Sequence, residues 1–298
     1  MQLMERGLNM KIAVTGATGH LGYHVVKGLL EKLPSQDVIA VVRDAAKAAG
    51  LARRGAVVRV AGYGDFDALK QAFASVEKVL LISSNEIGQR FAQHRNVIEA
   101  ARAAGVKHIG YTSAPKATTT ALIVAPEHKA TEEFIFQSGM PYSIIRNNWY
   151  TENYLPQVEI ARKTGVIVAA VGRGRVASAS RIDFAEGAIA VLLGQGHEGK
   201  VYEFGGDYAW DYDELAKAIG EIVQRPVVYR PVDPQTLIRI LKDAGQNEGA
   251  AEFIVALDAN IAAGLLAEST GQLSALIGRP TTPLRKGLAD ALLLSKDA

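Results

Sequence analysis

The hydrophobic and polar positions of the first 145 residues alternate between short apolar runs and longer helical patterns. A β-branched run such as Val38–Val42 predicts a buried strand, whereas apolar residues that recur every three or four positions predict a helix. Strands that alternate with helices form parallel sheets, because a parallel connection needs a crossover long enough to hold a helix. The pattern therefore predicts a doubly wound α/β domain.

The elements of this domain can be placed along the chain. The predicted strands are Lys11–Thr15, Val38–Val42, Val57–Val60, Val79–Ile82, His108–Thr112 and Tyr142–Ile145. The predicted helices are Tyr23–Lys32, Phe66–Ala74, Gln89–Ala104 and Glu127–Gln137. The third helix has the clearest period, with Phe91, Val97, Ile98 and Ala101 facing inward and Gly105 placed to end it.

After Asn147 the pattern changes to shorter, mixed elements. We predict strands at Val166–Val171 and Lys200–Phe204, helices at Arg181–Leu193 and Asp211–Val223, a turn-rich segment at Arg225–Pro234 and apolar helical pieces beyond. Asp211 is expected to begin its helix as the N-cap. The expected division is a domain at 10–150 and a smaller α/β substrate region at 151–298, and the strand at 200–204 could rejoin the main sheet. The apolar stretch from Ile254 to Ile277 completes the core of that region or forms a homodimer face.

Composition narrows the class of protein. Hydrophobic residues make up 48% and charged residues 21% of the chain, which is ordinary globular usage. The 33 Lys and Arg residues nearly balance the 31 Asp and Glu residues, so the basic excess typical of nucleic-acid binding is missing. No apolar run is long enough to cross a membrane, and the first nine residues, which we treat as an extension without functional weight, hold no signal-peptide core. We therefore expect a cytoplasmic protein without nucleic-acid or membrane partners.

The absence of cysteine removes thiolate nucleophiles, disulfides and thiolate metal sites together. Any redox chemistry must then come from a bound cofactor. A glycine-rich loop between the first predicted strand and helix, with Gly16, Gly19 and Gly22, is placed to bind one. The first glycine allows a tight turn, the second leaves room for a pyrophosphate, and the third lets the helix pack on the strand. The loop predicts a dinucleotide site in a Rossmann-type sheet.

Arg43 at the end of the second predicted strand bears on the choice of cofactor. Enzymes that use NAD commonly place an acidic residue there, about 20 residues after the loop, against the ribose hydroxyls. A guanidinium instead binds a 2′-phosphate through two charge-assisted hydrogen bonds of about 1.5–3 kcal/mol each. The sequence therefore favours NADPH over NADH. Asp44 keeps a ribose contact open as an alternative.

Other arrangements resemble catalytic or metal sites but lack the necessary context. Tyr23 and Lys27 have the Tyr-x-x-x-Lys spacing of many short-chain dehydrogenases, yet both lie on the helix that leaves the glycine loop. His20 and His24 lack a third ligand, so we expect no metal. The segment 194–201 is close to a phosphate loop, but Val201 stands where a hydroxyl is needed.

Several segments together resemble the NmrA-like branch of the atypical short-chain dehydrogenases/reductases, which includes quinone and triphenylmethane reductases. The resemblance runs over nearly the whole chain from Lys11, and its segments are 15–22, 80–84, 88–90, 93–96, 146–154 and 197–203. The glycine loop is shared across the superfamily. The segment Arg146-Asn-Asn-Trp-Tyr-Thr-Glu-Asn-Tyr154 is more specific to this branch.

The resemblance implies an NADPH-binding domain and a smaller C-terminal region, with substrate bound in a cleft over the nicotinamide. It also implies cofactor contacts from Gly16, Ala17, Thr18, Gly19, His20, Leu21, Arg43, Ser83, Ser84, Asn147, Asn148, Trp149, Tyr150, Thr151 and Glu152. There is one departure. The family tends to carry Asp after the third strand, where this chain has Gly62, so backbone groups at Tyr63 or Asp65 would have to contact the adenine.

Amide and aromatic side chains directly follow the sixth predicted strand, where open α/β sheets bind ligands. The candidate catalytic residues are Asn148, Tyr150 and Lys129. A planar acceptor could stack on Trp149 or Tyr150, although these rings could also serve only to pack the second region. Further polar groups expected to reach the cleft are Tyr111, Thr112 and His128.

The absence of a usable Tyr-x-x-x-Lys pair limits the acceptor. Reduction of a ketone needs a proton donor, whereas hydride addition to a quinone gives a phenolate that water can protonate, and a cationic triphenylmethane dye is simply neutralised. We therefore expect hydride transfer from NADPH to a quinone or similar planar electron-poor aromatic substrate. The alternative is an NmrA-like regulator that binds NAD(P) and senses redox state without turnover.

Overall fold

The computed structural model describes residues 10–296. Residues 1–9, which the sequence analysis sets apart, and residues 297–298 lie outside the described part of the chain. The chain forms two compact units. The first contains the residues up to Ala114, Pro126–Arg146 and Phe184–Tyr202, and the second contains Pro115–Ala125, Asn147–Asp183 and the residues from Glu203 onward. The division differs from a single cut near residue 150, because the segment 184–202 returns to the first unit.

A seven-stranded sheet organises the first unit, in the order β3-β2-β1-β4-β5-β6-β9. The strands are β1 (Ile12–Val14), β2 (Val38–Val42), β3 (Val57–Val60), β4 (Lys78–Leu81), β5 (His108–Ser113), β6 (Tyr142–Asn147) and β9 (Lys200–Phe204). The pairings among β1 to β6 are parallel, and Ile12 lies opposite Val38 of β2 on one side and Lys78 of β4 on the other. The strand order reverses at β1, as in a Rossmann-type doubly wound sheet, and the predicted fold class is confirmed.

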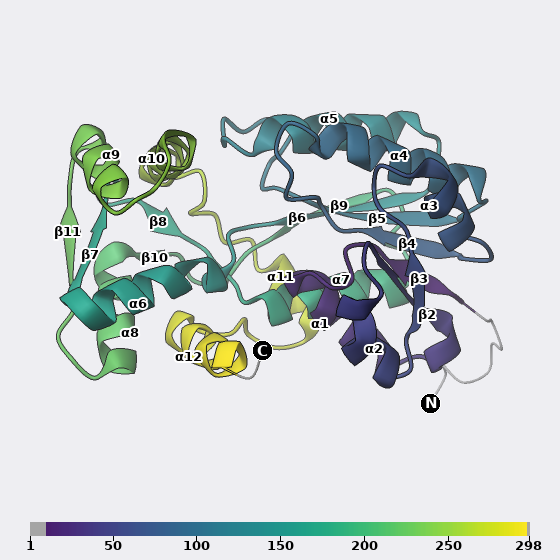
Figure 1. Cartoon of the computed structure of the whole chain (residues 1–298), viewed down its shortest axis with the longest axis horizontal. Coiled ribbons are helices and arrows are strands. Elements are labelled where there is room, and N and C mark those ends of the chain that lie inside the picture. The colour runs from purple at the N-terminus through teal and green to yellow at the C-terminus, as the bar shows by residue number, and fades with distance from the viewer. Residues whose placement is uncertain (1–9, 297–298) are drawn as a thin grey trace. The chain divides into compact units, whose positions relative to one another are not determined.

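Helices cover both faces of this sheet (Figure 1). One face carries α3 (Phe66–Ala72), α4 (Arg90–Ala103) and α5 (Ala125–Gln137), and the other carries α1 (His20–Leu30), α2 (Ala49–Arg53) and α7 (Arg181–Leu193). The predicted inward residues Val97, Ile98 and Ala101 of α4 are fully buried, and Gly105 follows this helix with φ +78°. On the other face α1 and α7 pack closely, since a Cβ on Gly28 would lie 2.5 Å from Cδ1 of Ile189. The helices on both faces pack against the sheet, and the resulting core holds the strand ends in place.

The second unit contains two small sheets and a set of helices. β7 (Val166–Ala169) pairs in parallel with β11 (Val228–Pro231), and β8 (Arg175–Val176) pairs antiparallel with β10 (Trp210–Asp211). The helices are α6 (Leu155–Thr164), α8 (Tyr212–Val223), α9 (Pro234–Asp243), α10 (Glu248–Ala262), α11 (Gln272–Ile277) and α12 (Leu284–Lys296). Short 3-10 turns are η1 (Ser35–Asp37) and η2 (Ala46–Ala48) in the first unit and η3 (Thr151–Tyr154) in the second. The strand β11 corrects the prediction of turns alone at 225–234.

Local sequence signals explain much of this second unit. Asp211 begins α8 as predicted: its side chain accepts a hydrogen bond from the N–H of Glu214, and the Glu214 side chain accepts one from the N–H of Asp211, both at 3.0 Å. From the apolar stretch 254–277, the side chains of Ile261, Leu266 and Leu273 are at most 1% exposed. That stretch therefore contributes to the core of its own unit.

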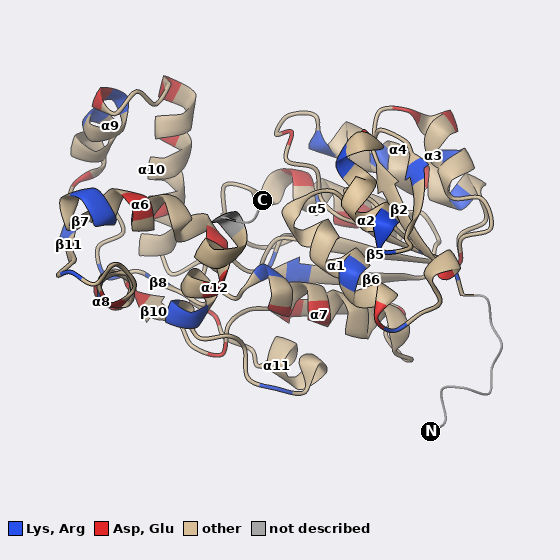
Figure 2. Cartoon of the chain, turned by 60° about the horizontal axis from the view of Figure 1, so that its bottom comes forward, with Lys and Arg blue, Asp and Glu red and all other residues tan. Residues whose placement is uncertain are grey.

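Charged residues of both signs are interspersed along the helices of each unit (Figure 2). Within residues 10–296 no helix is long and apolar enough to span a membrane. In the same range no three His, Asp or Glu side chains are grouped as they would be around a metal ion.

Candidate cofactor site

The glycine-rich loop has the tight backbone that the sequence predicts. Gly16 has φ +59°, in the left-handed region that favours glycine, and its carbonyl accepts a hydrogen bond from the N–H of Gly19 at 2.9 Å. A Cβ on Gly22 would lie only 2.3 Å from the carbonyl oxygen of Gly16. Helix α1 can therefore cross the loop at this distance only because position 22 has no side chain.

The start of α1 fits the phosphates of a dinucleotide. Gly19 is the N-cap and supplies no side chain to the amide groups of the first turn, which have no partners within the helix and carry the positive end of its dipole. Thr18, Gly19 and His20 are exposed, whereas Ala17 and Leu21 are buried. An anion at this turn would meet backbone amides, and Ala17 and Leu21 can contribute only their backbone.

The hydroxyl group of Tyr63, a residue that follows β3, supports the glycine-rich loop. Its hydroxyl oxygen lies 2.7 Å from both Thr15 Oγ1 and the carbonyl oxygen of Ile82, and it would be 3.1 Å from a Cβ on Gly16. Burial raises the pKa of the Tyr63 phenol, so it stays protonated. Tyr63 thereby joins the ends of β1, β3 and β4 through one hydroxyl. From the sequence, only the backbone of Tyr63 was expected to make a contact, because nothing local to residue 63 indicates partners at 15 and 82.

Arg43 extends from the end of β2 into solvent, with 71% of its side chain exposed. Its stem passes Gly62, where a Cβ would lie 3.9 Å from Cγ of Arg43. Its Nη1 is 2.8 Å from Oε1 of Glu86. Asp44, the alternative ribose contact, accepts a hydrogen bond from the N–H of Ala46 at 2.9 Å and is held within its own turn. The guanidinium is a largely exposed cation at this strand end, which suits a 2′-phosphate.

Ser83 and Ser84 follow β4 and are partly exposed. The N–H of Ser83 donates to Thr112 Oγ1 at 2.9 Å, and the N–H of Ser84 donates to His94 Nε2 at 2.8 Å. The hydroxyl of Ser84 donates to Oε1 of Gln93 at 2.5 Å. The side chains of Thr112 and His94 therefore hold the two backbone amides, so the loop after β4 has a defined shape.

His94 is the buried support of that loop. It accepts from Ser84 through Nε2, so its proton is on Nδ1, which lies 3.0 Å from Thr131 Oγ1. Thr131 in turn donates to the carbonyl of Glu127 at 2.7 Å. Burial lowers the pKa of His94 to about 3, so the ring is neutral near pH 7. The segment 93–96 carried part of the family resemblance, but its role was not predicted.

The expectation that Tyr111, Thr112 and His128 reach a cleft is wrong. Tyr111 is 0%, Thr112 1% and His128 6% exposed. The hydroxyl of Tyr111 lies 2.7 Å from Nδ1 of His128, and the hydroxyl of Thr112 is bound to the Ser83 amide. Buried polar groups need hydrogen-bond partners, and these three side chains find theirs inside the first unit, where β5 packs against α4 and α5.

The segment 147–152 belongs to the second unit, and its residues serve different roles there. Asn148 is 7% exposed, and its side chain donates to the carbonyl of Leu266 at 3.2 Å and accepts from the N–H of Trp149 at 2.7 Å. Thr151 Oγ1 lies 2.9 Å from Ser178 Oγ. Asn148 and Thr151 therefore hold the segment in shape.

Asn147 and Tyr150 present groups suited to a ligand. Oδ1 of Asn147 is buried and has no hydrogen-bond partner in the described part of the chain, and its Nδ2 lies 3.5 Å from the hydroxyl of Tyr150. An unpaired buried acceptor is costly unless a ligand N–H reaches it. The Arg181 guanidinium lies 4.9 Å from the centre of the Tyr150 ring, and Glu152 Oε1 accepts from the N–H of Arg181 at 2.8 Å. Burial raises the pKa of Tyr150, which keeps the phenol neutral.

Lys129 lies on α5 with half of its side chain exposed, and its Nζ is 3.9 Å from Oε1 of Glu133. The first unit therefore brings together the glycine loop, Arg43, Ser83 and Ser84 at the carboxyl ends of β1, β2 and β4. The remaining predicted residues lie on α5 or in the second unit.

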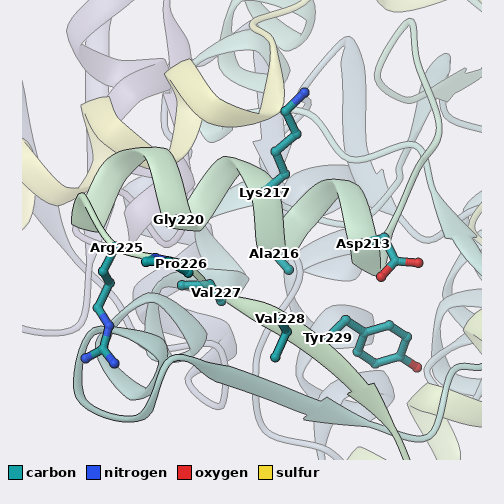
Figure 3. A pocket seen from close by; sticks show the side chains of 9 residues that line it. All are labelled: Asp213, Ala216, Lys217, Gly220, Arg225, Pro226, Val227, Val228 and Tyr229. Carbon is teal, nitrogen blue, oxygen red and sulfur yellow. The ribbon is translucent and has the colours of Figure 1, made fainter.

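A cavity of about 550 Å³ in the second unit lies between α8 and β11 (Figure 3). Lys217 and Tyr229 are among its lining residues, and none of the predicted site residues lines it. Its Arg225 donates to the carbonyl of Arg162 at 2.9 Å, near the end of α6. This cation therefore satisfies backbone carbonyls at a helix C-terminus.

Known proteins share this fold. A family model described as NAD(P)H-binding matches residues 16–194, more than half of the chain. The chain belongs to this NAD(P)H-binding family. Within 278 aligned residues it is 45% identical to quinone oxidoreductase 2 of Escherichia coli, covering 93% of this chain and 97% of that protein.

Two solved structures are closely similar to this chain. The NADPH complex of an NADPH-dependent quinone oxidoreductase from Escherichia coli has a TM-score of 0.90 at 44% identity, covering 94% of this chain and 99% of that one. The NADP(H) complex of Citrobacter sp. triphenylmethane reductase also has a TM-score of 0.90, at 38% identity, covering 94% and 100%. The resemblance to quinone and triphenylmethane reductases is confirmed.

Proposed function

We propose that this chain is a reductase that transfers a hydride from NADPH to a quinone or a similar planar electron-poor aromatic acceptor. The proposal is carried by the glycine loop at the point where the strand order reverses, together with the Arg43 guanidinium at the end of β2. The quinone is supported by the 45% identical relative, which is a quinone oxidoreductase.

Each part of the chain has a defined task in this proposal. The amides at the start of α1 bind the pyrophosphate, and Arg43 binds the 2′-phosphate. Oδ1 of Asn147 accepts a hydrogen bond from the nicotinamide carboxamide. NADPH, when bound, supplies the hydride, so the protein contributes orientation and exclusion of water.

The three candidate catalytic residues differ in how well their surroundings suit the task. Tyr150 has a neutral phenol, suited to donate a hydrogen bond to the oxygen of a quinone. Asn148 is proposed as a positioning residue, because both ends of its amide are engaged within the second unit. Lys129 is proposed as a weak contact, since it is half exposed and faces Glu133. No strong acid is needed, because quinone reduction yields a phenolate.

The test is a titration with NADPH and NADH, followed by addition of benzoquinone, naphthoquinone and one triphenylmethane dye. NADPH binding with acceptor-dependent oxidation supports the reductase. Binding without turnover on any acceptor would favour the redox-sensing regulator.

Tyr150→Phe is expected to lower kcat for quinones while leaving the Kd for NADPH within about twofold, since one hydrogen bond to the acceptor is lost.

A cytoplasmic location and a homodimer are also proposed. The cysteine-free composition is compatible with the cytosol, and localisation of the tagged chain tests the proposed location. The homodimer rests on the apolar character of Ile254–Ile277, parts of which are only half-buried. Sedimentation at several concentrations tests the dimer.

A further inference from the structure

The Arg43 guanidinium is paired with a carboxylate inside the first unit, and this pairing bears on how NADPH is selected. Its Nη1 lies 2.8 Å from Oε1 of Glu86, which comes from the loop after β4. The pair is exposed, with 71% of the Arg43 side chain and 45% of the Glu86 side chain accessible. Exposed ion pairs stabilise only weakly, so a stronger anion can displace this carboxylate.

Glu86 is held by more than Arg43. Its Oε2 accepts a hydrogen bond from Nε2 of Gln93 at 2.7 Å, and its N–H donates to Oγ of Ser84 at 3.2 Å. The Ser84 hydroxyl donates back to the Gln93 amide. Arg90 adds a hydrogen bond from Nε to the carbonyl of Ser84 at 2.6 Å. These hydrogen bonds hold the Glu86 carboxylate next to the Arg43 guanidinium.

We propose that Glu86 is a specificity-determining residue that competes with the 2′-phosphate of NADPH for Arg43. A carboxylate and a phosphate both bind a guanidinium through parallel N–H to oxygen hydrogen bonds, and the phosphate carries more charge. NADPH therefore displaces Glu86, whereas NADH, which has only a hydroxyl there, leaves the pair in place. Glu86 thus lowers the affinity for NADPH and has little effect on NADH. The inference rests on the proposed function.

The test measures binding by fluorescence or calorimetry, with NADPH, NADH and the fragment 2′,5′-ADP, which carries the 2′-phosphate but no nicotinamide. Glu86→Gln is expected to tighten NADPH and 2′,5′-ADP by about 2–5-fold, the equivalent of an exposed ion pair, and to leave NADH within error. In an Arg43→Gln background the same substitution is expected to change nothing. Asp44→Asn is the charge-matched control, since Asp44 is adjacent to Arg43 but bound to its own turn.

Two results would overturn the inference while the proposed function stands. One is that Asp44→Asn tightens NADPH binding as much as Glu86→Gln does, which would mean that any carboxylate near Arg43 has the same electrostatic effect. The other is weaker NADPH binding by Glu86→Gln, which would mean that Glu86 orients Arg43 for the phosphate. If neither NADPH nor 2′,5′-ADP binds the unchanged protein, the proposed function and the inference fail together.

Discussion

At the scale of single residues, Gly22 shows how little space the cofactor loop allows. Adding one methyl group would place it 2.3 Å from the carbonyl oxygen of Gly16, so the loop or α1 must move. Gly22→Ala is expected to cost about 1–3 kcal/mol of unfolding free energy and to weaken NADPH at least tenfold. Denaturant unfolding and a binding titration measure the two effects.

Gly50 provides the matched control for this substitution. It also lies in a helix, but a Cβ there would meet nothing within 4 Å. Gly50→Ala is expected to leave NADPH binding unchanged and to stabilise the fold by about 0.5–1 kcal/mol. Equal losses in both variants would contradict the argument from crowding at Gly22.

Arg43 gives a second prediction at this scale. Arg43→Ala removes the guanidinium but no packing, since the side chain is largely exposed. NADPH affinity is expected to fall by about 10–100-fold, whereas NADH affinity stays nearly constant, because only the 2′-phosphate contact is lost. Arg54→Ala, at an exposed position after α2, is the control. A parallel loss for both cofactors would count against recognition of the 2′-phosphate.

At the scale of elements, one buried ion pair joins α5 to the neighbouring strands. Arg146 of β6 donates from Nε to Oε1 of Glu132 at 2.9 Å and from Nη2 to Oε2 at 2.6 Å. The Glu132 side chain is 0% exposed, and Ser113 of β5 also donates to it. Arg146→Met is expected to destabilise the fold by about 3–5 kcal/mol, because a buried carboxylate is left without its cation.

An exposed pair of the same residue types is the reference for that measurement. Arg95 lies 2.9 Å from Glu99 on the surface of α4, with 57% of its side chain exposed. Arg95→Met is expected to change the unfolding free energy by less than about 1 kcal/mol. If both variants lose the same amount in urea unfolding, the Glu132 pair is not a structural link.

The same scale shows what the sequence could predict. The strand β2 was placed correctly because its apolar run is buried throughout, as expected for a central strand of a parallel sheet. The strand β11 was taken for turns, because Pro226 precedes it and Pro231 is its last residue. Its stability comes from pairing with β7, more than 50 residues earlier in the chain. The glycine loop and Arg43 could be proposed as cofactor contacts from the sequence because the signal for each is local. Glu86 and His94 were not, because their partners are distant in sequence.

At the scale of the whole molecule, buried histidines of the first unit and a buried aspartate of the second unit respond to acid in opposite directions. In the first unit burial lowers the pKa of His94 to about 3 and that of His108 to about 4, and it lowers that of His128 as well. In the unfolded chain these rings take up protons near pH 6.5. Below that pH the unfolded state binds more protons, so each ring removes up to about 1.4 kcal/mol of stability per pH unit until its own pKa is reached.

Asp258 in the second unit has the opposite sign. Burial raises its pKa to about 6, and its carboxylate accepts a hydrogen bond from the N–H of Ala170 at 2.7 Å. Between about pH 6 and its unfolded value near 3.9 the folded state binds more protons, so this group adds stability as the pH falls. Hydrogen exchange at pH 7.5 and 5.5 should therefore show faster global opening of the first unit, with the second unit less affected. Faster exchange in the second unit alone would contradict this assignment.

The position of β9 in the sheet has a consequence for how the chain is synthesised. The strand next to it, β6, ends at Asn147, and β9 begins at Lys200, about 50 residues later. A ribosome adds roughly 5–20 residues per second, so β6 waits about 3–10 s as an unpaired edge. Nascent chains stalled between these points should recruit chaperones through the free edge of β6, which pull-down of the stalled complexes measures.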